Sequence, residues 1–264
     1  VVTLNADEKG YINLEELERE VDENTILVSI MYVNNEVGTV QPIEKMAEII
    51  KSKNKNCIFH TDCVQAFGKH PINGKHFDAI SVSGHKIHCP KGVGVLYLRK
   101  GVRAKNLHFG GGQEKGFRPG TENTGSIVAM GLGAEIAKRD LEKNFEKVKA
   151  VKEKLMTICD ILPDVYVNGD SENGSPYILN LSFEGVKGEV LLHALENYEI
   201  YVATGSACSS RAKEKKKIVD YLIDGRGSST VRFSFDCENT VEEAEKAIEV
   251  LKEQVPMLRM FQPR

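Results

Sequence analysis

The chain has 264 residues, of which 41% are hydrophobic and 28% are charged. This length and composition suit one large domain or two ordinary ones with a sizeable core, and they exclude a disordered chain. The 35 Lys and Arg residues nearly balance the 38 Asp and Glu residues, for a net charge of -3. We therefore expect no nucleic-acid partner, and no membrane partner either, because no apolar run is long enough to span a bilayer.

The first part of the chain alternates predicted helices and strands. Apolar residues at helical spacing predict helices over 13–21 and 42–53. Short apolar runs predict strands over 25–33, 57–62, 77–84 and 92–101, and further helices are expected over 126–137 and 141–155. The opening residues, VVTLNADEKG, also look like a strand. Strands that alternate with helices and are apolar on both faces indicate an α/β fold, with a mostly parallel sheet and helices on both faces.

The C-terminal part of the chain has a different pattern. Strands are predicted over 163–169, 177–183 and 229–235, and amphipathic helices over 188–198 and 240–255. Strands and helices without strict alternation are typical of a smaller α+β domain. We therefore predict a large domain over residues 1–141 and a small C-terminal domain over residues 142–264.

Polar side chains follow three of the predicted strands. Lys86 comes directly after one strand, in SVSGHKIHCPKGVG, with Ser83 and His85 beside it. Asp62 ends a second strand and Gln65 follows it, and a third strand ends in VNNEVG. Open α/β sheets bind ligands at the carboxyl ends of their strands. An amine, a carboxylate, amides and phosphate-binding donors together are the set that a pyridoxal phosphate (PLP) site needs.

Each of these features also has a plainer explanation. SGHK can be an ordinary turn after a strand, and an acidic residue at a strand end can cap a turn or a helix. A metal site is the weaker alternative, since His85 and His88 are three residues apart but only Cys89 is at hand to complete a ligand set. We expect no metal.

Five stretches of the chain, taken together, resemble the NifS/IscS-type (group I) cysteine desulfurases. They are VNNEVGTVQPI, HTDCVQAFGK, SVSGHKIHCPKGVGVLYLRKG, GGGQEKGFRPGTEN and ATGSACSS, and their order and spacing agree over the whole chain. These enzymes are class V aminotransferase-like proteins of PLP fold type I. The resemblance implies PLP as cofactor, L-cysteine as substrate and L-alanine as product. It also implies a homodimer and a sulfur acceptor, either an iron–sulfur cluster scaffold or another protein.

The resemblance assigns roles to residues that would surround the cofactor ring. Lys86 would be the lysine that binds PLP covalently. Asp62 would pair with the pyridine nitrogen, and Gln65 and Asn35 would lie by the phenolic oxygen. The carboxylate would keep that nitrogen protonated, so that the ring can act as an electron sink.

Further residues would bind the phosphate and the substrate. By the same resemblance, Ser83 and His85 would bind the phosphate, and Thr121, in RPGTEN, would reach the phosphate of the partner subunit. Arg232, in STVRFSF, would bind the α-carboxylate of the substrate, with Asn35 close by.

Cys208 is the central residue of the implied reaction. It lies in ATGSACSSRAK among small residues that offer little packing, which predicts a mobile segment. As a thiolate it would attack the sulfur of bound cysteine and keep that sulfur as a persulfide. Lys86 and Cys208 are thus the catalytic residues that the resemblance implies. The six cysteines lack CxxC spacing, which is typical of reduced thiols and of a cytoplasmic protein, and those at 57, 63, 159 and 237 are expected to be structural.

The chain departs from the family pattern at several points. His88 and Cys89 stand where an aromatic residue and a glycine are common, and Cys63 replaces a small residue beside Asp62. Family members carry an earlier segment with a phosphate-binding turn and a histidine that stacks on the cofactor. We therefore expect this chain to be the C-terminal part of a longer enzyme, and not a complete active enzyme by itself.

Two alternatives to a cysteine desulfurase remain open. One is a related PLP lyase or aminotransferase, such as a selenocysteine lyase, which needs no cysteine in a loop. The other is a non-catalytic subunit or fragment that retains the fold. The cofactor's absorption would distinguish the second alternative from an enzyme.

Overall fold

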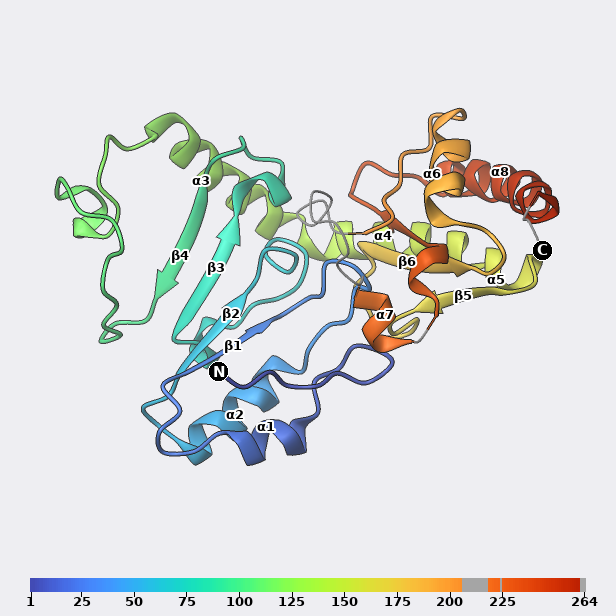
Figure 1. Cartoon of the computed structure of the whole chain (residues 1–264). Coiled ribbons are helices and arrows are strands. Elements are labelled where there is room, and N and C mark those ends of the chain that lie inside the picture. The colour runs from blue at the N-terminus through green and yellow to red at the C-terminus, as the bar shows by residue number, and fades with distance from the viewer. Residues whose placement is uncertain (206–217, 224, 262–264) are drawn as a thin grey trace. The chain divides into compact units, whose positions relative to one another are not determined.

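The computed structural model describes residues 1–205, 218–223 and 225–261 (Figure 1). Contacts between Cα atoms divide the chain into two compact units, each assembled from separate stretches of sequence. Unit 1 consists of residues 1–16, 33–41 and 142–264, and unit 2 of residues 17–32 and 42–141. The boundary between the units after residue 141 coincides with the predicted domain boundary. Residues 1–16 and 33–41, however, group with the C-terminal part of the chain and not with the predicted large domain.

Unit 2 is built on a four-stranded sheet. In spatial order its strands are β1 (Leu27–Met31), β2 (Ile58–Asp62), β3 (Ala79–Ser83) and β4 (Gly94–Leu98). The first three are parallel to one another, and β4 runs antiparallel to β3. The mostly parallel sheet predicted from the sequence is confirmed. The connection from β3 to β4 is too short for a crossover helix, so the last pair is antiparallel.

Two longer helices belong to unit 2. The first, α2 (Ile43–Lys53), buries Ile43, Met46, Ala47 and Ile50, which lie three or four residues apart as on one face of a helix. The second, α3 (Thr124–Arg139), begins after Asn123, whose side chain accepts a hydrogen bond from the amide of Ser126. The short helix α1 (Leu14–Glu20) begins in unit 1 and ends in unit 2.

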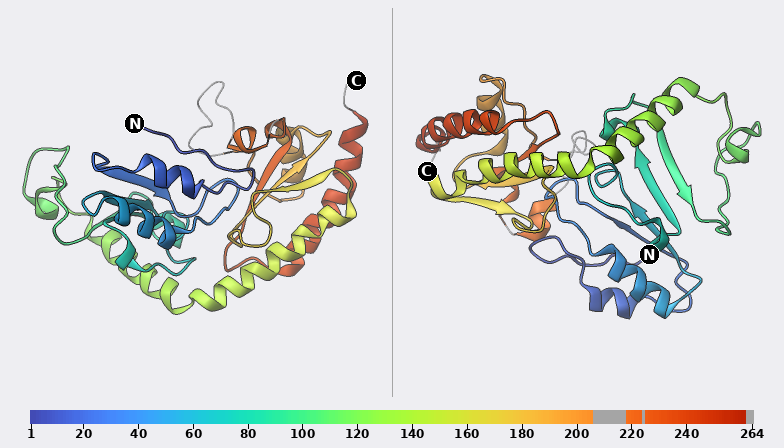
Figure 2. Two further views of the ribbon diagram at one scale, coloured as in Figure 1. Left: turned by 90° about the horizontal axis from the view of Figure 1, so that it is seen from below. Right: turned by 180° about the vertical axis from the view of Figure 1, so that it is seen from behind.

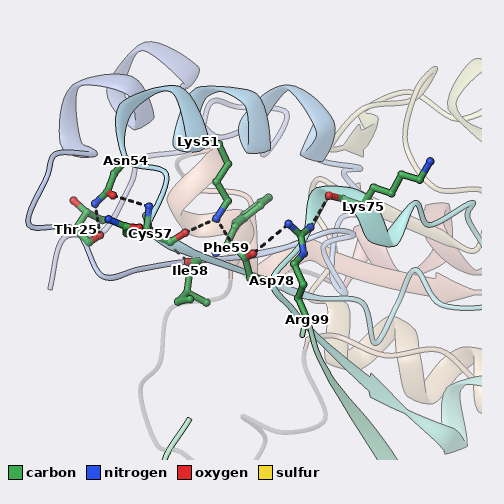
Figure 3. Close-up of polar contacts among 10 residues, drawn as sticks. Thr25, Lys51, Asn54, Cys57, Ile58, Phe59, Lys75, Asp78 and Arg99 are labelled. Carbon is green, nitrogen blue, oxygen red and sulfur yellow. Dashed lines mark hydrogen bonds and ion pairs between the residues drawn. The ribbon is translucent and has the colours of Figure 1, made fainter. Parts of the chain in front are cut away.

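A cluster of polar groups lies at the amino-terminal end of β3 (Figure 3). The carboxylate of Asp78, 5% exposed, accepts hydrogen bonds from Nζ of Lys51 and from the amide of Phe59. Nη1 of Arg99 lies 3.5 Å from the same carboxylate, and Lys51 also donates to the carbonyl oxygen of Cys57. The cluster therefore ties α2 to three neighbouring strands around one buried charge.

Unit 1 contains a three-stranded antiparallel sheet, in the order β5 (Val165–Asn168), β6 (Ile178–Phe183) and β7 (Thr230–Ser234). Its helices are α4 (Leu141–Met156), α5 (Ile158–Ile161), α6 (Gly188–Glu196), α7 (Ile218–Leu222) and α8 (Val241–Met260). Helices α4, α6 and α8 lie beside this sheet (Figure 2). Residues of all three helices share one apolar core with it. The predicted α+β character of the C-terminal part is confirmed, whereas α5 and α7 were not predicted.

The opening residues form no strand, contrary to the prediction. Ala6 and Ile12 pair only in an isolated bridge. A single apolar stretch cannot specify a strand without a partner at hydrogen-bonding distance, which is why the prediction was wrong. Of the helices in the described residues, none has the length and apolar character needed to cross a membrane.

Candidate functional site

The carboxyl ends of β1, β2 and β3 lie at the same end of the unit 2 sheet, because these strands are parallel. Asp62 is the last residue of β2 and stands opposite Ser81 of β3. His85 and Lys86 belong to a short 3₁₀ helix, η2 (Gly84–Ile87), which directly follows Ser83. The structure thus brings the predicted carboxylate, lysine, serine and histidine to one end of one sheet.

The carboxylate of Asp62 is fixed by the backbone but only partly satisfied. Its Oδ1 accepts a hydrogen bond of 2.8 Å from the amide of Val64. The carbonyl oxygen of Asp62 accepts from the amide of Tyr32, which anchors the end of the strand. In the described part of the chain, Oδ2 accepts no hydrogen bond. The carboxylate therefore has a defined position and one oxygen available to a ligand.

A row of hydrogen-bonded side chains crosses the sheet next to Asp62. Nδ1 of His60 lies 2.8 Å from Oγ of Ser29, and its Nε2 lies 2.9 Å from Oγ of Ser81. Burial lowers the pKa of His60, although the nearby Asp62 opposes this effect. His60 was not among the site residues predicted from the sequence. The signal that could have identified His60 is the alternation of side chains along a strand, which puts His60 and Asp62 on the same face.

The turn after β3 holds the predicted lysine. Oγ of Ser83 and Nδ1 of His85 are 2.8 Å apart, so the two predicted phosphate ligands already contact each other. Lys86 is half-buried, and no group in the described residues pairs with its ammonium. An amine without a partner, held in a short turn, is available for bonding to a ligand.

Two of the residues that depart from the family pattern, His88 and Cys89, complete this turn. His88 ends η2 in the left-handed conformation, with φ of 61°. Sγ of Cys89 lies 3.5 Å from the carbonyl oxygen of Ile87 and 3.6 Å from that of Ala129 in α3. Gly133 of α3 is also needed here, because a Cβ atom at that position would overlap with the Cys89 sulfur. His88 and Cys89 therefore shape the turn and its packing on α3.

Gln65 and Thr121 lie in two separate loops of unit 2. Oε1 of Gln65, in the turn after β2, is 3.4 Å from Nζ of Lys69. Thr121 is exposed in the loop before α3, where its carbonyl oxygen accepts from Nη1 of Arg118. Within the described residues, neither side chain is hydrogen-bonded to Asp62 or Lys86. No cluster of three or more His, Cys, Asp and Glu side chains suited to a metal occurs there either.

Asn35 and Arg232 both belong to unit 1, where residues 33–40 form a tight hairpin. Val33 and Val40 pair across it, and Oδ1 of Asn34 accepts hydrogen bonds from two amides of the turn. Nη1 of Arg232, in β7, donates to the carbonyl oxygen of Asn35 at 3.0 Å. The structure thus joins these two predicted residues, through the backbone of Asn35 and not through its side chain.

The surroundings of Arg232 leave part of its guanidinium unused. Burial lowers its pKa, and the neighbouring Glu36 opposes this effect. Its Nε is buried and has no hydrogen-bond partner among the described residues. A buried donor without a partner is costly, so a ligand that accepts from it would be bound favourably.

Cys208 lies outside the described residues, but the described thiols can be compared with one another. Cys57 and Cys63 are buried. Burial raises the pKa of Cys57, that of Cys63 to about 12 and that of Cys159 to about 11. Such thiols stay protonated near neutral pH and are poor nucleophiles, because only the thiolate attacks.

The fold and these residues agree with a known family. Residues 1–247 match the model of the aminotransferase class-V family, and the chain belongs to this family, whose members are PLP enzymes. It is 40% identical over its whole length to a cysteine desulfurase of Nostoc sp., and it spans 66% of that protein. It is 37% identical, again over its whole length, to the cysteine desulfurase IscS of Clostridium botulinum, of which it spans 68%.

Solved structures show the same relationship. A NifS-like protein superimposes with a TM-score of 0.89 at 37% identity, over 97% of this chain and 68% of the other. A NifS-like protein from Rickettsia africae gives a TM-score of 0.85 at 28% identity, over 96% and 69% of the two chains. The predicted fold type I class and the relation to NifS/IscS proteins are therefore confirmed. The chain spans about two thirds of the length of these relatives.

Proposed function

We propose that this protein is a PLP-dependent cysteine desulfurase, which converts L-cysteine to L-alanine and keeps the sulfur on Cys208 as a persulfide. The observation that carries the proposal is the placement of Asp62 and Lys86 at the carboxyl ends of the parallel strands β2 and β3. The 40% identity to a cysteine desulfurase supports the choice of reaction. We further propose that the enzyme is a cytoplasmic homodimer that passes the sulfur to an iron–sulfur scaffold or another acceptor protein.

The residues at this end of the sheet fit PLP. Lys86 has an ammonium without a partner in the described residues, and Asp62 keeps one carboxylate oxygen available. Ser83 and His85 add a hydroxyl and an imidazole close by. When bound, PLP supplies an electron sink for bonds at the α-carbon of the amino acid.

Each of these residues would act on a different part of the cofactor. Lys86 would hold it covalently. Asp62 would keep a proton on the pyridine nitrogen, because a carboxylate fixed nearby favours the charged form of that nitrogen. Ser83 and His85 would bind the phosphate, together with Thr121 of the partner subunit.

The hairpin and β7 would supply further contacts. The side chains of Asn35 and Gln65 would donate toward the phenolic oxygen of the cofactor. Arg232 would bind the α-carboxylate of cysteine through its Nε and Nη2, since Nη1 is already held by the carbonyl of Asn35. A planar guanidinium matches a carboxylate with two parallel hydrogen bonds.

Cys208 would carry out the sulfur transfer. Its thiolate forms a bond to the substrate sulfur while the bond between that sulfur and the substrate Cβ breaks. The electron pair of the broken bond stays on the carbon side, which takes up a proton and leaves as alanine. The sulfur remains on Cys208 as a persulfide until an acceptor takes it.

The decisive experiment substitutes this cysteine in the protein purified as its gene encodes it. Cys208→Ser should still bind PLP and L-cysteine, seen by absorption, but should form no alanine and no persulfide detectable by mass spectrometry. The reason is that a serine hydroxyl is not ionised near neutral pH, whereas a thiol is partly ionised. Cys159→Ser is the matched control and should keep most activity, because burial raises the pKa of that thiol to about 11.

Two outcomes would replace the proposal. If Cys208→Ser turns over cysteine at the rate of the unsubstituted protein, a lyase without a cysteine nucleophile, such as a selenocysteine lyase, is the better assignment. If the unsubstituted protein shows neither the cofactor's absorption nor turnover, the protein is a non-catalytic subunit with this fold.

A further inference from the structure

Three polar residues form a row across the sheet of unit 1. Asn168 of β5 stands opposite Asn180 of β6, and Asn180 stands opposite Arg232 of β7. Side chains at paired positions lie on the same face of a sheet, so the two amides and the guanidinium are neighbours. Asn168 is 1% exposed and Asn180 is 4% exposed. Water is therefore excluded from both amides, and only the protein can supply hydrogen-bond partners; within the described residues Oδ1 of Asn168 has none.

Hydrogen bonds fix the orientation of both amides. Nδ2 of Asn168 donates to Oδ1 of Asn180 and to Oγ of Ser182, each at 2.8 Å. Because Oδ1 of Asn180 accepts from Asn168, its Nδ2 is directed toward the hairpin, where it donates to the carbonyl oxygen of Glu36 at 3.1 Å. The network thus decides which atom of the Asn180 amide faces the hairpin.

Arg232 holds the adjacent carbonyl of the same hairpin. Its Nη1 donates to the carbonyl oxygen of Asn35, one residue before Glu36. Two neighbouring side chains of the sheet, Asn180 and Arg232, therefore hold two consecutive carbonyl groups. The position of the Asn35 carbonyl sets the rotation of the guanidinium. This rotation decides in which direction the edge with the unpaired Nε points.

We propose that Asn180, oriented by Asn168, is a positioning residue for the α-carboxylate of the substrate. By holding the Glu36 carbonyl, Asn180 fixes the peptide group that directly follows the one bound by Arg232. Arg232 then presents Nε and Nη2 together, as bidentate binding of a carboxylate requires. The inference rests on the proposed function, in which Arg232 binds that carboxylate, and it involves no contact between Asn180 and the substrate.

Kinetics of Asn180→Leu in the holoenzyme test this role. Leucine has a similar size but cannot donate to Glu36. The KM for L-cysteine should rise about tenfold, the effect of losing one hydrogen bond, while kcat stays within about twofold. The inhibition constant of L-alanine, which carries a carboxylate, should rise by a similar factor. That of cysteamine, which lacks a carboxylate, should not change.

Ser182→Ala is the matched control. Ser182 accepts the other hydrogen bond of Asn168 and lies on the same strand as Asn180, but in the described residues its side chain makes no hydrogen bond to the hairpin. Its substitution should leave KM within about twofold, even if the melting temperature falls as in Asn180→Leu. If Asn180→Leu does not fold, Asn180→Thr, which keeps a hydroxyl for Asn168 but is shorter, should give the same rise in KM.

The outcomes separate this inference from the function on which it rests. If the unsubstituted protein neither converts L-cysteine nor binds L-alanine, the proposed function is wrong. If it does both, and the Asn180 variants keep the normal KM for L-cysteine, then Asn180 is only structural and the positioning role is wrong.

Discussion

Two aspartates, Asp78 and Asp62, lie at opposite ends of the unit 2 sheet and differ in burial and in hydrogen-bond partners. Asp78, before β3, is 5% exposed and is surrounded by Lys51, Arg99 and a backbone amide. Asp62, at the end of β2, is half-buried and accepts only from the amide of Val64 within the described residues. Groups of the protein pair with both oxygens of the Asp78 carboxylate, whereas Oδ2 of Asp62 accepts no hydrogen bond in the described residues. Satisfaction by the protein's own groups therefore distinguishes a structural charge from a candidate functional one.

The largest effect on activity is expected from Asp62→Asn. Without the negative charge the pyridine nitrogen of PLP is no longer kept protonated, so kcat for cysteine should fall about 1,000-fold, equivalent to about 4 kcal/mol. The free energy of unfolding should change by less than about 1 kcal/mol, because the carboxylate makes one backbone hydrogen bond. Alanine formation and urea unfolding measure the two quantities. Normal turnover in this variant would exclude the role of Asp62.

Asp78→Asn should give the reverse result. Neutralising a buried carboxylate leaves Lys51 without its counter-charge and should lower the free energy of unfolding by about 3 kcal/mol. The KM for cysteine should not change. Glu146→Gln, which removes an exposed charge, serves as the control and should change stability by less than about 0.5 kcal/mol. A loss of activity without a loss of stability in Asp78→Asn would contradict the comparison.

Lys152 extends the comparison to a buried cation of unit 1. It is 5% exposed, Nζ donates to the carbonyl oxygen of Ser175, and burial lowers its pKa from 10.5 to about 8, although Asp170 opposes this. Between pH 8 and pH 10.5 the unfolded chain holds the proton that the folded chain has released. The free energy of unfolding therefore rises with pH in this window, by about 3 kcal/mol in total.

The comparison of the unsubstituted protein with Lys152→Met isolates this effect from other titrating groups. The stability difference should shift toward the unsubstituted protein as pH rises from 7.5 to 10.5, on the order of 3 kcal/mol. Lys149→Met, at an exposed position of the same helix, should show no such shift. A flat difference for Lys152→Met would show that the amine is effectively hydrated in the folded chain.

The smallest effect is expected from Arg99→Met. This side chain is 37% exposed and lies 3.5 Å from the Asp78 carboxylate, so water screens part of the interaction. The free energy of unfolding should fall by about 1 kcal/mol or less. Thermal or urea unfolding measures it. A loss as large as that in Asp78→Asn would mean that Arg99, and not Lys51, is the main partner of the buried carboxylate.

The sequence by itself determined the elements with strong local patterns, and with them the family. Helix α2 was predicted over 42–53 and is found at Ile43–Lys53, and β2, β3 and β4 each lie within their predicted runs. These predictions succeed because hydrophobic periodicity is a property of neighbouring residues. The strand-end positions of Asp62 and Lys86 follow from the same patterns. Roles such as that of Cys208 come from the resemblance alone and stay predictions.

Only the tertiary structure decided which distant residues meet. The row of Asn168, Asn180 and Arg232 depends on the register of three strands, and a shift of one residue in any of them would turn its side chain to the other face. The grouping of residues 33–41, which contain the hairpin, with residues 142–264 likewise depends on contacts between segments far apart in the chain, such as the hydrogen bond from Asn180 to Glu36. Register and long-range pairing are set by packing and hydrogen bonding across the whole sheet, and no local pattern in the sequence encodes them.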